Sequence, residues 1–149
     1  MKKRLIWTVA AVLYILFIYS NSLKTADLSS ADSGHVLELV KNLFTSAGME
    51  NRWLTEHIIR KAGHFTEYTL LGMILYQCVK LYDFDMEKRL FIHEAAGFLI
   101  PFIDETIQLF VSGRSGQISD VWLDFSGVAA GTMIAALLFF IYAKEWSKI

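Results

Sequence analysis

Four long apolar runs divide the chain, at about residues 5–19, 62–79, 90–111 and 121–142. A helix needs about 20 mostly apolar residues to cross a bilayer. The runs are close to that length, and short polar segments separate most of them. We therefore predict an all-α integral membrane bundle of about four transmembrane helices, formed by one domain over residues 1–149.

The first run follows three basic residues at positions 2–4, so it also resembles a secretory signal peptide. Ser20-Asn21-Ser22 would serve as its small-residue cleavage site. The run contains the bulky side chains Trp7, Tyr14, Phe17 and Tyr19, and further spans follow it. We therefore expect an uncleaved helix.

The segment between the first two runs has a helical pattern of its own. Its apolar residues recur at spacings of three and four, at Val36, Leu39, Val40, Leu43 and Phe44. Ser29 or Ser30 would cap the start of this helix, and Gly48 would end it. The pattern predicts an amphipathic helix that lies on the membrane surface, covers the bundle or simply packs against it.

Positive charge indicates which ends of the spans are cytoplasmic. Residues 1–4, residues 80–89 and the C-terminal tail all carry lysine or arginine. Four alternating spans place these three segments on one side, so we predict that both termini are cytoplasmic. Residues 23–60 and 112–119 would then face outward. The composition agrees with a membrane location, since 54% of the residues are hydrophobic and 19% are charged.

The overall charge and the cysteine content exclude several classes of function. The formal net charge is −1, which argues against a nucleic-acid partner. Cys78 is the only cysteine, so neither an internal disulfide nor a cysteine-rich zinc site is possible. The oligomeric state is not indicated by the sequence.

Ionisable residues inside spans are costly, and here they gather near the predicted outer ends. Arg60, His64 and Glu67 are spaced i, i+4 and i+7, which places them on one face of a helix. The third span carries Asp104, Glu105 and Gln108 late in its course, and the loop after it contains Arg114. Asp120 and Asp124 lie one turn apart at the start of the fourth span. The predicted orientation puts all of these groups at a similar depth.

These residues resemble the VanZ-like family along nearly the whole chain. The matching segments are Arg60-Lys61-x-x-His64-Phe65-x-Glu67-Tyr68-x-x-Leu71-Gly72, then Asp104-Glu105-x-x-Gln108-x-Phe110-x-x-Gly113-Arg114, and Asp120-x-x-x-Asp124-x-x-Gly127. Ser20 and Ser22 resemble the family's serine-containing start of the first outer loop. The resemblance implies a bacterial multi-pass protein of the cell membrane. The member that gives the family its name is associated with resistance to teicoplanin, so a link to glycopeptide antibiotic resistance follows by resemblance.

Three hypotheses account for the polar cluster. In the first, Arg60, Lys61 and Arg114 neutralise the carboxylates in a purely structural ion-pair network. In the second, the same basic residues bind the phosphate or carboxylate of a membrane lipid or a lipid-linked envelope precursor. Gln108, Asp120, Ser20 and Ser22 would complete that ligand site. A site at this depth lets the ligand's tail remain in the bilayer.

The third hypothesis is an intramembrane enzyme for phosphoryl or acyl transfer. His64 would act as general base, oriented by Glu67 or Asp104, with Asp124 or Glu105 as its acid partner. Arg114 would stabilise developing negative charge, and Ser20 or Ser22 would be the nucleophile. A metal-dependent variant would use His64, Glu67 and aspartates of the other spans. One histidine beside carboxylates defines no particular metal, so we predict neither a metal nor another cofactor.

Overall fold

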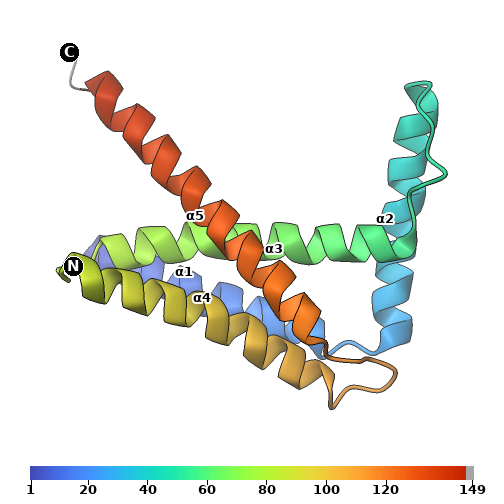
Figure 1. Cartoon of the computed structure of the whole chain (residues 1–149), viewed down its shortest axis with the longest axis horizontal. Helices are drawn as coiled ribbons and strands as arrows, with labels where there is room; N and C mark the ends of the chain where they lie inside the picture. Colours follow the sequence, from blue (N-terminus) through green and yellow to red (C-terminus); the bar gives the residue numbers. More distant parts are fainter. Residues whose placement is uncertain (147–149) are drawn as a thin grey trace.

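The computed structural model describes residues 1–146 as five α-helices, with no strand in this part of the chain. Lys148, part of the basic tail used to predict the orientation, lies outside the described residues. The helices are α1 (Lys2–Ser22), α2 (Ala26–Ser46), α3 (Glu56–Lys80), α4 (Met86–Gln108) and α5 (Ile118–Trp146), shown in Figure 1. The all-α prediction is confirmed. The third predicted span is too long at its end, because its helix stops at Gln108 rather than residue 111.

α3 lies at the centre of the fold and contacts each of the other four helices. The buried core consists of Ile18 from α1, Tyr68, Leu71 and Leu75 from α3, Ile100 from α4 and Val128 from α5. Ile18 is 1% exposed, so α1 contributes fully to this core. α1 is therefore packed against the other helices as part of the bundle.

Glycines allow α3 and α5 to cross in direct backbone contact. A Cβ atom added at Gly131 would overlap the Thr69 carbonyl oxygen, and one added at Gly72 would overlap the Val128 carbonyl oxygen. At Gly127 the added Cβ would lie 2.7 Å from the Phe65 carbonyl oxygen. The GxxxG spacing of Gly127 and Gly131 thus serves packing against α3 within the same chain. This crossing fixes the position of α5 relative to the polar half of α3.

Two helices, Lys2–Ser22 and the Ile118–Ile141 part of α5, are long and apolar enough to cross a membrane. Large apolar side chains remain exposed along both, among them Leu13, Leu16 and Phe17 on α1 and Leu138 and Phe140 on α5. α3 and α4 carry more ionisable residues, which lower their hydropathy even though they have 25 and 23 residues.

The two ends of the bundle differ in chemistry. At one end, the N-terminus lies beside the α3–α4 connection (Figure 1), where Thr8 Oγ1 is 2.8 Å from the Tyr82 hydroxyl. Arg4 stacks over the Tyr82 ring at 5.6 Å. At the other end, the α1–α2 turn meets the α4–α5 loop, where the Ala26 amide donates to the Ser112 carbonyl at 3.2 Å. Two of the three basic segments thus share one end, and the polar cluster occupies the other.

α2 is the amphipathic helix that the sequence predicted, although its start differs. Its N-cap is Thr25, four residues before Ser29, the nearer of the two predicted caps, and the chain turns away at Gly48 with φ +70°. Figure 1 shows α2 lying crosswise to α1 and α3 and projecting beyond them. Leu39 and Leu43 on its apolar stripe are each 62% exposed. Most of this stripe is therefore not covered by the bundle.

Candidate functional site

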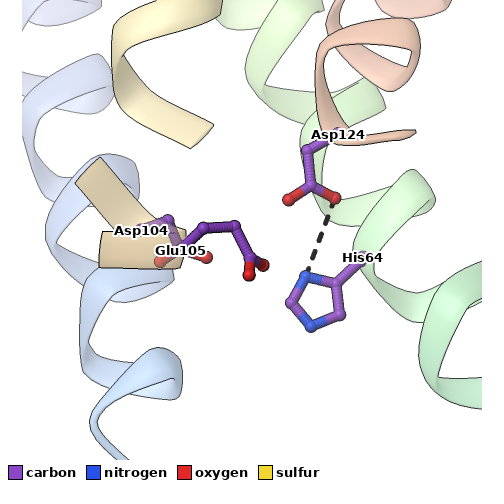
Figure 2. A group of neighbouring side chains, drawn as sticks. All are labelled: His64, Asp104, Glu105 and Asp124. Atoms are coloured by element: carbon purple, nitrogen blue, oxygen red, sulfur yellow. Dashed lines mark ion pairs between the residues drawn. The ribbon is translucent and has the colours of Figure 1, made fainter. Parts of the chain in front are cut away.

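A histidine and three carboxylates from three different helices converge at the polar end. His64 comes from α3, Asp104 and Glu105 from α4, and Asp124 from α5, and Figure 2 shows the Glu105 side chain extending toward His64 and Asp124, with Asp104 beside it. One ligand-type atom from each residue lies within 4.8 Å of the others. Asp104 and Asp124 are fully buried, and Glu105 is 4% exposed. We call these four residues the acidic cluster.

Groups on one side of the acidic cluster hold two of its carboxylates. Gln108 Nε2 donates to Glu105 Oε1 at 2.9 Å and to Asp104 Oδ2 at 3.3 Å. The Gln117 amide donates to Glu105 Oε2 at 2.9 Å. Among the described residues, Asp104 Oδ1, both Asp124 carboxylate oxygens and His64 Nδ1 are buried without a hydrogen-bond partner. Asp104 and Glu105 are therefore held by groups outside the acidic cluster, whereas both Asp124 oxygens lack a hydrogen-bond partner.

The basic residues do not form the network that the first hypothesis requires. Lys61 pairs with Asp120. Arg60 pairs at 3.7 Å with Glu56, one turn earlier on α3 and outside the expected set. Among the side chains of residues 1–141, no lysine or arginine forms an ion pair with Glu67 or with a carboxylate of the acidic cluster. The expected neutralisation is present only at Asp120.

Arg114 is held by neutral acceptors. Its guanidinium donates to the Asn21, Ser22 and Lys24 carbonyls at 3.2–3.4 Å and to Ser29 Oγ at 3.3 Å. Partial burial lowers its pKa, while the charges of Asp104 and Glu105 act in the opposite direction. A guanidinium nevertheless stays protonated in proteins. Arg114 thus presents a positive charge without a carboxylate partner in the described structure.

Two polar cavities meet at His64, Arg60 and Arg114. The first, of about 240 Å³, lies between the α1–α2 turn and α3 and is also lined by Ser22 and Glu67. The second, of about 180 Å³, lies between α3 and the α4–α5 loop, and its lining includes His57, Lys61, Gln108, Gln117 and Asp120. Basic side chains outnumber acidic ones around both cavities, although Lys24 and Asp32 of the first cavity pair with each other, and His64 connects the cavities to the acidic cluster.

An apolar groove continues from the first cavity. The groove and the cavity share Asn21, Val36, Ile59, Gly63 and Glu67. From there the groove, of about 570 Å³, follows α1 and α3 to Tyr14, Phe17 and Leu70. Val36 and Val40 place the apolar stripe of α2 along one side of it. A polar compartment and an apolar one are thus continuous.

The two serines in the predicted site have different positions. Ser22 is 2% exposed and lines the first cavity. Ser20 is exposed, lines neither polar cavity, and donates its hydroxyl to the Phe17 carbonyl of its own helix at 2.7 Å. The structure therefore places Ser20 away from both polar cavities, because residues two positions apart on a helix point in directions about 200° apart.

Two residues of the site were missed from the sequence. Asn21 donates to Glu67 Oε1 at 2.9 Å, and this bond places Glu67 at the wall of the first cavity. Gln117 acts through its backbone amide, which carries no sequence signal. Asn21 is a polar amide at the end of an apolar run, which is a usable sequence signal for a site residue. From the sequence alone, Asn21 is assigned only to the possible cleavage site.

The geometry of His64 bears on the enzyme hypothesis. His64 Nδ1 lies 3.7 Å from Asp124 Oδ1, beyond hydrogen-bond distance. Glu67 instead accepts from Asn21. The structure thus brings His64 to a carboxylate without the short bond that orients a general base.

Together, the all-helical fold of the described residues and its two helices that are long and apolar enough to cross a membrane define an all-α protein with a polar site at one end. The chain belongs to the VanZ/LLP1 family, whose model matches residues 5–140. Membership associates it with membrane proteins linked to antibiotic resistance. Comparison with curated proteins and with solved structures gives no match.

Proposed function

We propose that this protein binds the anionic head group of a membrane amphiphile, a lipid or a lipid-linked envelope precursor, at the polar cavities around Arg114. The observation that carries the proposal is the unpaired guanidinium: Arg114 lines both cavities, and its hydrogen bonds go to neutral oxygens. A guanidinium binds phosphate or carboxylate through two parallel hydrogen bonds. Arg60 and Lys61 add positive charge to the same walls.

The shape of the site supports an amphiphile over a fully polar ligand. The first cavity leads into the apolar groove, so a charged head in the cavity continues naturally into a tail along α1 and α3. Phe17 and Leu70 at the far part of the groove are 51% and 48% exposed. In a bilayer these side chains would contact lipid, and a tail could stay in its ordinary surroundings.

The proposal includes four membrane spans, formed by α1, α3, α4 and α5, in the bacterial cell membrane. Both termini would be cytoplasmic, and the polar cavities would lie at the outer leaflet. The shared end of the N-terminus and the α3–α4 connection supports this arrangement, since it collects basic residues as the positive-inside rule requires. A link to glycopeptide resistance would then act through binding of an envelope lipid.

The test compares ligand retention with stability in the full chain. The protein is reconstituted in nanodiscs of phosphatidylcholine and anionic phosphatidylglycerol, extracted, and examined by native mass spectrometry. Wild type should retain the anionic lipid. Arg114→Ala should retain at least about tenfold less, because a charge-assisted hydrogen bond is worth about 1.5–3 kcal/mol. Arg114→Lys should restore part of the retention, because lysine keeps the charge and loses the bidentate geometry.

Arg52→Ala is the matched control, since Arg52 is 91% exposed and lies outside both cavities. Retention is measured only on the folded monomer peak, and the melting temperature is recorded for each variant. If Arg114→Ala keeps the anionic lipid as wild type does, the proposal is wrong. A large loss of stability with unchanged retention would favour a structural role for Arg114.

A further inference from the structure

We propose that His64, Asp104, Glu105 and Asp124 bind one divalent cation of the first transition series. This inference replaces the sequence-based expectation that the protein has no metal. It concerns the acidic cluster itself, so it is independent of the amphiphile proposed for the cavities.

The four residues are arranged as ligands to a common centre. They come from α3, α4 and α5, and their side chains converge in Figure 2. Zinc-type ligands lie about 2.0–2.2 Å from the ion, so two ligands on opposite sides are at most about 4.4 Å apart. Neighbouring ligands in a tetrahedral site are about 3.4 Å apart, so the present limit of 4.8 Å between ligand atoms requires the side chains to draw together on binding. Rotation of side chains would achieve it without moving the helices.

The buried oxygens provide an independent reason to place a cation here. Asp124 is 0% exposed, and neither of its oxygens has a hydrogen-bond partner among the described residues. Asp104 Oδ1 and His64 Nδ1 are likewise buried without a hydrogen-bond partner by the same distance and angle criteria. A buried charged group is costly unless it is paired or coordinates a metal. These four atoms belong to the acidic cluster, and the Tyr68 hydroxyl, Lys80 Nζ and Arg89 Nε are the other buried atoms without a partner in the described structure.

In the described structure, Lys61 and Arg114 form no ion pair with the acidic cluster. Lys61 is engaged by Asp120, and Arg114 is engaged by the α1–α2 turn. Three carboxylates within one small volume repel each other strongly when ionised. Shared protons or a bound cation would relieve that repulsion. The histidine, which supplies a nitrogen ligand, favours the cation.

The hydrogen bonds around the acidic cluster are those expected outside a metal centre. Gln108 and the Gln117 amide bind the Glu105 oxygens, and Gln108 also binds Asp104 Oδ2. Such outer partners orient metal-binding carboxylates and fix their rotamers. They leave Asp124 free toward the interior, while Asp104 also lies within reach of the Ser22 and Tyr68 hydroxyls. His64 lines both cavities, which provides a route for the ion to enter.

The donor set indicates the class of metal. Imidazole suits zinc, iron and copper, whereas carboxylates suit manganese, magnesium and calcium. One imidazole with three carboxylates therefore favours Mn²⁺, Fe²⁺ or Zn²⁺ over Ca²⁺ and Mg²⁺. The single cysteine, Cys78, lies at the other end of α3 beside Thr8 and takes no part.

Binding is tested on the purified full chain after removal of metals with EDTA. Mn²⁺ is titrated in, and the free ion is measured by electron paramagnetic resonance, with Zn²⁺ added as a competitor. Wild type should bind one Mn²⁺ per chain, and Zn²⁺ should displace it. Asp124→Asn and His64→Gln should each weaken binding at least about tenfold, because loss of an outer partner alone costs 10- to 100-fold. Glu50→Gln, at an exposed carboxylate outside the cluster, should bind as wild type does.

Two measurements on wild type keep the test decisive if a variant fails to fold. The metal should raise the melting temperature of the wild-type protein, and EDTA should reverse the increase. Zinc X-ray absorption should show oxygen and nitrogen ligands without sulfur. Failure of wild type to bind either metal would overturn the inference and leave shared protons as the state of the acidic cluster. Equal binding by wild type and folded Asp124→Asn would overturn it as well.

Discussion

Adding a single methyl group at Gly131 should loosen the bundle at the crossing of α3 and α5. An alanine Cβ there would overlap the Thr69 carbonyl oxygen, which is fixed within α3 and cannot rotate away. At Gly127 the added Cβ would be 2.7 Å from the Phe65 oxygen, about 0.7 Å short of the 3.4 Å at which ordinary contact begins. The overlap at Gly131 is deeper, so α3 and α5 would have to separate further in Gly131→Ala than in Gly127→Ala.

The size of the effect follows from a comparison with Gly63→Ala. Gly63 also lies in a helix, and an added Cβ there meets nothing within 4 Å. Both substitutions gain the same helix propensity, about 1 kcal/mol, so their difference isolates the clash. Overpacking costs about 1–3 kcal/mol, occasionally more. We expect the free energy of unfolding of Gly131→Ala to lie at least about 2 kcal/mol below that of Gly63→Ala, with Gly127→Ala between them.

The assay is reversible unfolding in mixed micelles, with the denaturing detergent fraction as the variable and helicity as the signal. The same displacement should separate His64 from Asp124, because Gly127 follows Asp124 by one turn and contacts the residue after His64. Mn²⁺ binding should therefore weaken in Gly127→Ala. If Gly131→Ala is as stable as Gly63→Ala, the α3–α5 contact described here is incorrect.

Two further outcomes are expected. In a Cys78→Ser background, a cysteine at Ser46 should react with an impermeant thiol reagent in intact cells, and one at Asp83 should not. Both positions are exposed in the structure. The opposite labelling pattern would reverse the proposed orientation. Asp85→Ala should lower the free energy of unfolding by about 1 kcal/mol, since Asp85 Oδ1 caps α4 by accepting from the Lys88 amide at 2.7 Å. Retention of the anionic lipid should be unchanged in Asp85→Ala, and a parallel loss of both would argue against separate roles for the two ends.

The helices could be predicted from the sequence because each has a strong local signal. Apolar runs revealed α1, α3, α4 and α5, and the spacing from Val36 to Phe44 revealed α2. The charge distribution also predicted that the polar ends of three spans meet, which the structure brings about at His64, Glu105 and Asp124. The ends of helices were less accurate, since capping competes with tertiary contacts at each terminus.

The pairing within the site could not be predicted. Arg114 binds backbone carbonyls, and every residue offers one, so no sequence pattern marks them. The selection of Asp120 by Lys61 depends on the register of α3 against α5, which is set by the glycine contacts. The carboxylates looked like partners for arginine in the sequence. In the structure, three of them face one another and a histidine.

The groove between α1, α2 and α3 determines whether occupancy of the proposed site depends on the ligand's concentration in the membrane or in water. It ends on Phe17 and Leu70, both about half exposed on the bundle surface. A ligand held there would enter and leave sideways without passing through water. Its occupancy would then follow its mole fraction in the leaflet and would be insensitive to dilution of the vesicles. Titrations should accordingly vary lipid composition at constant protein-to-lipid ratio, and a water-soluble head-group analogue should compete only weakly.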